Sequence, residues 1–379
     1  MNKIIKTITW ILVIIIIIGI FYIVNRKSIG PIFTTSTPIK IGAILPLTGI
    51  NSDLGNSVRA GLEEAENEIN KKGEKLKVIY EDSQGDVKTA LTIAQKLIEI
   101  DKIDAMIVFL DPISVALAPV TNERKIIQIS LTVNSEINKL SDYSFTIFPT
   151  VDSEIPVQIE YVKSKKPKKI AIFHVNVPSH VYAKDKLISE MEKEGIISRD
   201  DVHIETIQVN DADYSTQLTK IASFKPDLLI TYIYPSFLNR FYKQISVFKI
   251  NVPILMNLGG IGLPYVDSQY TNYVENTVFT APIFYTRENE KLKNLIEKAK
   301  DKNQKLDLTM FAYGYDSLSI LFNALLNSNK DIDKAIEFIK NLRDYQGVSG
   351  KITIDKNRNS QVEIRLTKYK NGNFVPYEK

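Results

Sequence analysis

Hydrophobic and polar residues follow two periods along the chain, one typical of buried strands and one typical of amphipathic helices. The run IKIGAIL at 39–45 is short, apolar and rich in β-branched residues, so it predicts a strand. The stretch 56–73 carries apolar residues at helical spacing and ends at Gly73, a common signal for a helix C-terminus. The pattern therefore predicts a strand followed by a helix at the start of the folded part of the chain.

The same alternation repeats as far as residue 257, with one break at 148–156. Further strands are predicted at 75–82, 104–110, 126–131, 168–175, 202–209, 227–234 and 253–257. Helices are predicted between them at 86–100, 114–125, 180–195, 214–224 and 236–248. This spacing predicts two doubly wound α/β lobes of about 100 residues each, with mainly parallel sheets covered by helices on both faces. Because such sheets bind ligands at the carboxyl ends of their strands, we expect a ligand cleft between the lobes.

The N-terminus carries an uninterrupted apolar stretch at 7–24, followed by Asn-Arg-Lys. Its length of about 18 residues is just enough for a helix that crosses a bilayer. A cleaved signal peptide is the alternative, although its apolar region is usually shorter, about 7–15 residues. The flanking basic residues favour a cytoplasmic N-terminus. We expect residues 1–27 to be a single membrane anchor and residues 28–38 a linker, with the body of the protein outside the cell membrane, or secreted if the segment is cleaved.

Composition and motifs exclude several classes of function. The net charge of +4 is too small and too evenly spread to indicate a nucleic-acid partner. The absence of cysteine excludes disulfides, a thiolate nucleophile and cysteine-ligated metal. The three histidines lack metal-ligand spacing, and neither a GxSxG elbow nor a GxGxxG loop is present. We therefore expect a binding protein without cofactor or metal, and not an enzyme.

The stretch at 39–73 resembles the opening of type I periplasmic binding proteins of the leucine/isoleucine/valine-binding family. These are the extracytoplasmic receptors of branched-chain amino-acid ABC transporters. Later segments fit the same order and spacing, and they lie at 78–98, 114–130, 168–175, 213–221 and 311–325. The likeness thus runs from residue 39 to the C-terminus, although no single motif in it is diagnostic.

The resemblance implies two lobes joined by three crossover segments. Lobe 1 would contain residues 39–150 and 282–345, and lobe 2 would contain residues 151–281 and 346–379. It also implies a monomeric receptor that closes by a hinge motion over a small amino-acid-like ligand and delivers it to the permease subunits of an ABC importer. A membrane-anchored sensor with the same fold is the alternative. A lactose-type repressor is excluded, because a membrane segment stands where its helix-turn-helix would be.

Three residues of lobe 1 match positions that hold the ligand in this family. Ser114 takes the position of a serine that binds the ligand carboxylate at a helix start, where free N–H groups favour an anion. Its alternative role is to cap that helix. The resemblance assigns backbone contacts to Thr132. Asn134 stands where the family has a threonine that helps to bind the ammonium, and the alternative for Asn134 is a turn.

Other positions match the family less closely. Tyr234 stands at a tyrosine that closes over the ligand, although it could also be a core residue. Ser179 and His180 replace a tyrosine and a glycine, and Leu54 stands where the family often has an aromatic residue. These replacements put the aromatic contacts of the family in doubt.

The largest departure lies at Gly259 and its neighbours, where branched-chain amino-acid binders carry a glutamate that pairs with the ammonium. Burying an ammonium without an acidic partner is costly. Either another carboxylate, such as Asp82, Asp111 or Asp267, takes its place, or the ligand is an amide or a carboxylate rather than a free amino acid.

Overall fold

The computed structural model describes four ranges of the chain, which are 37–275, 277–285, 289–300 and 306–378. The predicted membrane-spanning stretch at 7–24 lies outside them. Within these ranges, every helix is too short or too polar to span a membrane.

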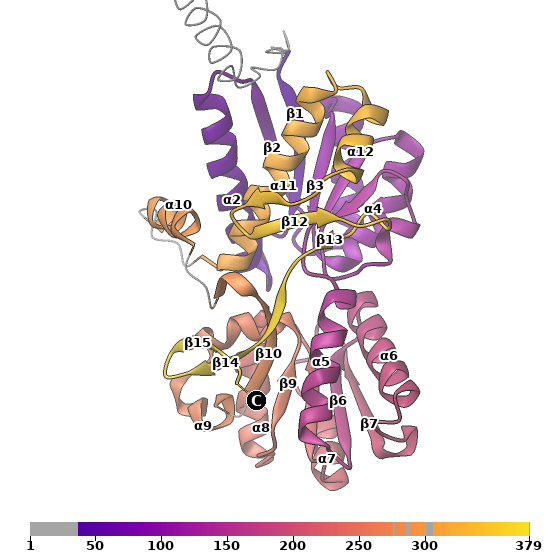
Figure 1. The fold of residues 1–379 in the computed structure, drawn as a ribbon, viewed down its shortest axis with the longest axis vertical. Coiled ribbons are helices and arrows are strands. Elements are labelled where there is room, and N and C mark those ends of the chain that lie inside the picture. Colours follow the sequence, from indigo (N-terminus) through magenta and orange to yellow (C-terminus); the bar gives the residue numbers. More distant parts are fainter. Residues whose placement is uncertain (1–36, 276, 286–288, 301–305, 379) are drawn as a thin grey trace, which may run out of the picture. The chain divides into compact units, whose positions relative to one another are not determined.

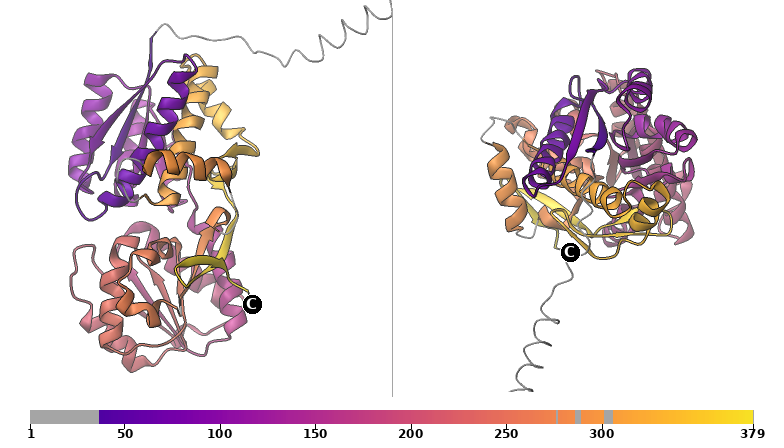
Figure 2. Two further views of the ribbon diagram at one scale, coloured as in Figure 1. Left: turned by 90° about the vertical axis from the view of Figure 1, so that its left-hand side faces the viewer. Right: turned by 90° about the horizontal axis from the view of Figure 1, so that it is seen from above.

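The first lobe is built on a five-stranded parallel sheet with the order β2-β1-β3-β4-β5 (Figure 1). Its strands are β1 (Ile39–Leu45), β2 (Leu76–Asp82), β3 (Ala105–Phe109), β4 (Ile127–Leu131) and β5 (Ser144–Thr146). The helices of this lobe are α2 (Ser52–Lys71), α3 (Val87–Lys96), α4 (Asp111–Arg124), α10 (Glu290–Lys300), α11 (Leu308–Asn327) and α12 (Ile332–Lys340). Strands β3 and β4 are buried along their whole length, as expected for parallel strands covered on both faces (Figure 2).

The second lobe is built on a seven-stranded sheet with the order β15-β14-β10-β9-β8-β6-β7. Its parallel strands are β6 (Ile170–Val175), β7 (Val202–Ile207), β8 (Leu228–Tyr232), β9 (Ile254–Met256) and β10 (Thr277–Pro282), and its antiparallel strands are β14 (Ile364–Lys370) and β15 (Asn373–Pro376). The helices are α5 (Val151–Lys165), α6 (Pro178–Lys193), α7 (Ser215–Phe224), α8 (Leu238–Val247) and α9 (Thr271–Val274). The predicted α/β architecture with mainly parallel sheets is thus confirmed.

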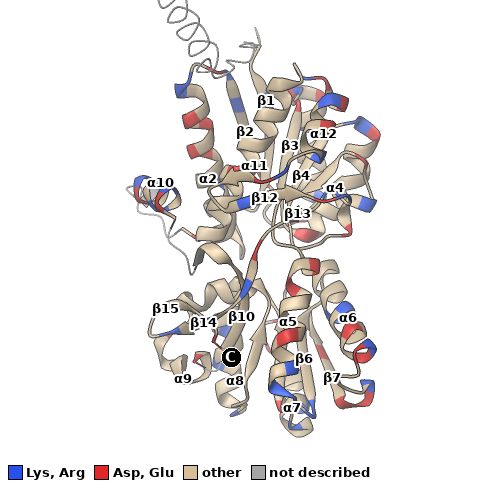
Figure 3. Ribbon diagram, viewed as in Figure 1, with Lys and Arg blue, Asp and Glu red and all other residues tan. Residues whose placement is uncertain are grey.

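Strand β6 shows how the sequence divides the core of this lobe. Ile170 and Ile172 pack in the cluster that includes α5 and α6, whereas Phe173 packs with α7 and α8 on the other face. Successive side chains of a strand point to opposite faces, so an unbroken apolar run is required where helices cover both. Charged residues of both signs are left on the outer helices of both lobes (Figure 3).

Helices α2 and α11 pack closely because each has a glycine at the contact. A Cβ on Gly61 would lie 2.1 Å from the carbonyl oxygen of Phe311, and one on Gly314 would lie 2.6 Å from that of Val58. Helix α11 also contacts β1, β3 and β4. The chain therefore returns from the second sheet to the first before it reaches its C-terminus.

Residues 345–361 form a small third sheet of β11 (Tyr345–Gly347), β12 (Gly350–Ile354) and β13 (Ser360–Gln361). The carboxylate of Asp316 on α11 accepts the backbone N–H groups of Val348 and Ser349, each at 2.8 Å. Arg358 donates to the carbonyl oxygens of Ser144 at 3.1 Å and Ser141 at 2.9 Å. The boundaries predicted for the two lobes remain a prediction, and we propose one adjustment: residues 345–361 belong with lobe 1, and β14 with β15 belongs to lobe 2.

Candidate ligand-binding cavity

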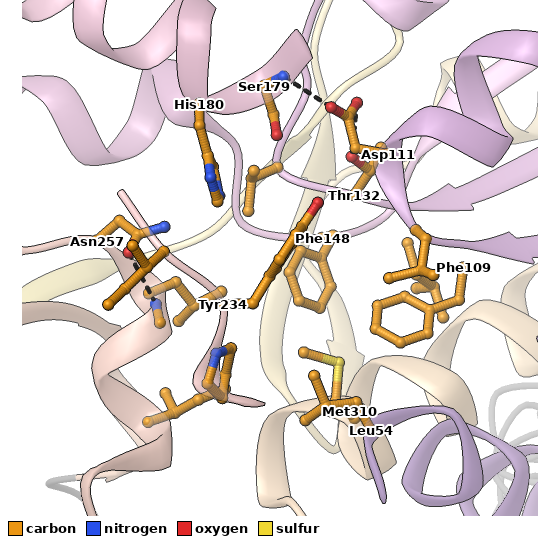
Figure 4. Close-up of a pocket in the computed structure, with 18 residues that line it drawn as sticks. Leu54, Phe109, Asp111, Thr132, Phe148, Ser179, His180, Tyr234, Asn257 and Met310 are labelled. Atoms are coloured by element: carbon orange, nitrogen blue, oxygen red, sulfur yellow. Dashed lines mark hydrogen bonds between the residues drawn. The ribbon is translucent and has the colours of Figure 1, made fainter. Parts of the chain in front are cut away.

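A cavity lies between the two sheets, at the carboxyl ends of their strands (Figure 4). Its volume is about 50 Å³, several times the ~15 Å³ that one buried water needs. Four strand ends form much of the wall, and they are Phe109–Asp111, Leu131–Val133, Ile233–Pro235 and Asn257–Gly259. The cavity therefore sits where open α/β sheets bind their ligands, with both lobes contributing.

The wall of the cavity is mainly apolar. Leu54 comes from α2, Met310 from α11, and Phe148 from the first segment that joins the sheets. Phe148 is itself held by an edge-to-face contact with Tyr313, with ring centroids 5.1 Å apart. Asp111 is the only acidic side chain among the described residues of the wall, and burial and the nearby His174 lower the pKa of His180, the one histidine there, to about 3. The lining suits a ligand with an apolar body.

Asp111 is the first residue of α4, and its carboxylate reaches from lobe 1 to lobe 2. Oδ2 accepts the backbone N–H of Ser179, at the start of α6, at 2.6 Å. Oδ1 accepts the side-chain amide of Asn134 at 2.9 Å and the hydroxyl of Thr132 at 3.4 Å. Burial raises the pKa of Asp111, while hydrogen bonds from these three residues act against the rise.

Two rings from lobe 2 face Asp111 across the cavity. The His180 and Tyr234 rings have centroids 4.9 Å apart, and Figure 4 shows the hydroxyl end of Tyr234 directed toward Asp111 and Thr132. His180 is 2% exposed, and its Nδ1 has no hydrogen-bond partner in the described part of the chain. This end of the cavity is therefore its polar end.

Five of the seven residues predicted from the sequence lie in the cavity wall, and they are Leu54, Thr132, Ser179, Tyr234 and Gly259. Glycine is required at the last of these, since a Cβ on Gly259 would lie 2.1 Å from the carbonyl oxygen of Ile233. The structure brings these residues together from five separate segments of the chain.

The other two predicted residues lie outside the wall. Helix α4 begins at Asp111, three residues before the predicted start, because Pro112 is well suited to the first turn of a helix. Ser114 is consequently inside the helix, where its N–H bonds to the carbonyl oxygen of Leu110 at 2.9 Å and its side chain is fully buried. Asn134 supports Asp111 and closes a turn, with its Oδ1 accepting the N–H of Glu136 at 2.9 Å.

Of the three carboxylates suggested as replacements for the missing glutamate, only Asp111 lines the cavity. Asp82 holds the loop after β1, accepting the N–H of Leu47 at 2.8 Å and the hydroxyl of Thr48 at 2.7 Å. Asp267 is exposed and caps a short helical turn.

A further carboxylate lies directly behind the wall and was not predicted. Glu154, on α5, is 3% exposed, and its Oε2 accepts the N–H of Leu258 at 2.9 Å and the hydroxyl of Thr280. Burial raises the pKa of Glu154 to about 7. Its hydrogen bond fixes the backbone of the loop that begins at Leu258 and includes Gly259.

The family model of the periplasmic binding proteins matches residues 38–373. The chain belongs to this family. This periplasmic binding protein is 26% identical over 296 residues to a Leu/Ile/Val-binding protein homologue of Brucella melitensis, covering 76% of this chain and 78% of the relative. The predicted resemblance to the branched-chain amino-acid receptors is confirmed, and the family implies an extracytoplasmic location.

Solved structures show the same fold. The leucine-binding protein of Thermotoga maritima has a TM-score of 0.80 at 23% identity, over 90% of this chain and 98% of the other. An ABC-transporter solute-binding protein of Rhodopseudomonas palustris, solved with 3,4-dihydroxy benzoic acid, has a TM-score of 0.78 at 19% identity, over 90% and 96%. Proteins of this fold thus bind ligands of different charge.

Proposed function

We propose that this periplasmic binding protein is the solute receptor of an ABC importer and encloses one small, mainly apolar molecule between its lobes. The observation that carries the proposal is the cavity at the carboxyl ends of both sheets, walled by residues of each lobe. A ligand there contacts both lobes only when they are close, so binding favours the closed arrangement. The permease would recognise that arrangement in a monomeric receptor.

The first connection between the lobes suits a hinge motion. It runs from β5 to α5, and Thr150 forms a capping box with Ser153 at the helix start. The cap fixes the first turn of α5, so rotation is confined to the few residues before it. Phe148 lies in this segment and in the cavity wall, which places a ligand contact next to the hinge.

The relatives supply two candidate ligand classes. One is named for leucine, isoleucine and valine, and another was solved with an aromatic acid. A branched-chain amino acid is the first candidate for this chain, and an amide or a carboxylate is the second. We place residues 1–27 as a membrane anchor that holds the receptor outside the cell.

Thermal unfolding of the full chain against amino acids, amines, amides and carboxylates tests the receptor function. A ligand at about 100 times its dissociation constant adds roughly 2.7 kcal/mol to the free energy of unfolding. We expect at least one solute to raise Tm in the wild type and to lose this effect in Tyr234→Ala. Phe338→Ala, an exposed residue on α12, is the control and should respond like the wild type. The absence of any shift would contradict the proposal.

A transport assay distinguishes this receptor function from that of a membrane-anchored sensor. In vesicles that contain the permease and its ATPase, uptake of the labelled solute requires this protein if it is the receptor. Uptake that is unchanged without the protein would favour the sensor.

A further inference from the structure

The buried carboxyl group of Asp111 has no cationic partner among the groups that donate to it. Its side chain is 3% exposed, and the donors are a backbone N–H, an amide and a hydroxyl, all neutral. The N–H of Ser179 and the NH₂ group of Asn134 can only donate, and they reach different oxygens of the carboxylate. Both oxygens therefore already accept a hydrogen bond, and these bonds favour the ionised form against the burial that raises the pKa of Asp111. A buried charge of this kind is stabilised by a counter-ion.

The cavity has few groups that could bind a ligand carboxylate. Among the described residues of its wall there is neither lysine nor arginine. At the start of α4, Pro112 has no N–H, and Ser114, predicted to bind an anion there, lies within the helix and outside the wall. At the start of α6, the N–H of Ser179 is already bonded to Asp111. An anionic group in this cavity would meet the acidic side chain of Asp111 instead.

We infer that the ligand is a small organic amine with an apolar body, whose ammonium pairs with Asp111 and which needs no carboxylate. This inference rests on the proposed receptor function and replaces the amino-acid, amide and carboxylate candidates named above with an amine. It differs from the binding of an amino acid, in which both charged groups must be held.

A second group at the same end of the cavity supports an ammonium. The neutral imidazole of His180 offers one acceptor nitrogen, and its buried Nδ1 has no partner in the described part of the chain. Figure 4 shows this ring on the lobe 2 side of the cavity and Asp111 on the lobe 1 side. An ammonium has three N–H donors, so it can bond to both lobes at once. The apolar body of the amine would then lie toward Leu54, Phe148 and Met310.

Calorimetric titration of the full chain with ligands matched in shape and different in charge tests the inference. One set is isoamylamine, leucine, isocaproamide and isocaproate, and the other is benzylamine and benzoate. We expect the amine of at least one set to bind, and its carboxylate to bind roughly 30-fold more weakly or not at all, as for the loss of a buried charge pair. A carboxylate that binds as tightly as its amine, or leucine binding where isoamylamine does not, would overturn the inference. The failure of both amines to bind would overturn it too.

Asp111→Asn provides an independent test. The variant keeps an acceptor oxygen and removes the charge, so we expect the affinity for the amine to fall roughly 30-fold and the affinity for the neutral amide to change little. Asp267→Asn, an exposed acid outside the wall, should leave both affinities unchanged. An equal loss for amine and amide would refute the charge pairing. If Asp111→Asn does not fold, the calorimetric titrations of the wild type with the two ligand sets still test the inference.

The two proposals fail in different ways. A carboxylate or an amide bound more tightly than the amine refutes the amine and leaves the receptor function standing. No binding by any compound of the broad thermal panel refutes the receptor function itself.

Discussion

Replacing Glu154 by glutamine should make the protein more stable, and increasingly so as the pH rises. Glu154 is buried, and its Oε2 accepts hydrogen bonds from the N–H of Leu258 and the hydroxyl of Thr280. The amide oxygen of glutamine can accept the same two bonds. The substitution keeps both acceptor bonds and removes the titration, while the two N–H donors that it adds change stability by the same amount at every pH, so the pH-dependent part of the difference isolates the titration.

The magnitude follows from the pKa of Glu154, which burial raises from 4.5 to about 7. Below pH 4.5 the carboxyl is protonated in the folded and the unfolded chain, so it imposes no charge penalty. Between these two values the unfolded chain releases the proton while the folded chain keeps it, and stability falls as the pH rises. Above about pH 7 the full penalty, roughly 3 kcal/mol, is present.

Urea unfolding of both proteins, followed by circular dichroism between about pH 5 and pH 8, measures the difference. Asp307 and Asp316, whose pKa values burial raises to about 6, contribute equally to both proteins and cancel. The stability gained by Glu154→Gln should grow by about 2–3 kcal/mol across this range. Glu192→Gln, on the exposed face of α6, controls for the substitution itself. A gain that is independent of pH would refute the reasoning.

Three further substitutions test two positions in the cavity wall and the contact between the third sheet and lobe 1. Gly259→Ala should lower the free energy of unfolding by about 1–3 kcal/mol and weaken ligand binding, because its Cβ meets a backbone oxygen at 2.1 Å. Gly195→Asn, at φ +64 with open space around it, should cost no more than about 1 kcal/mol and leave ligand binding unchanged. Equal losses of ligand affinity at the two sites would contradict this. Arg358→Ala should lower the free energy of unfolding by roughly 2–4 kcal/mol, because the bonds to the carbonyl oxygens of Ser144 and Ser141 are lost. Arg358→Lys should recover part of this stability, and an unchanged urea midpoint for Arg358→Ala would count against these bonds. Leu54→Ala should lower the free energy of unfolding by about 2–5 kcal/mol and make the protein prefer bulkier ligands in calorimetric titration. An unaltered ligand preference would show that Leu54 does not contact the ligand.

The architecture could be predicted because burial on two faces leaves a strong pattern. Strand β1 was predicted at 39–45, where the structure has it, since a parallel strand covered on both faces must be apolar throughout. Helix α4 was placed three residues too late, because its apolar periodicity starts after Pro112 while the backbone starts at Asp111. The spacing of apolar residues shows which side chains are packed, but the first residue of a helix depends on backbone geometry, which that spacing does not show.

The cavity was harder to predict than the fold. Tyr234 and Gly259 could be placed by their matches to the family, but Ser114 could not, because its exposure depends on the start of the helix. Phe148 and Met310 were missed because an apolar residue that lines a cavity has the same sequence pattern as one in the core. The role of Asp111 depends on the bond to Ser179, 68 positions away in the chain, which only the folded structure reveals.

The central claim is that a solute binds between the two lobes, at the ends of both sheets. Amide hydrogen exchange of the full chain, with and without the solute that raises Tm most, tests it most directly. We expect ligand-dependent protection in segments of both lobes, namely 109–111 and 131–133 from lobe 1 and 233–235 and 257–259 from lobe 2. Protection confined to one lobe, or located away from these strand ends while the solute is bound, would contradict the account.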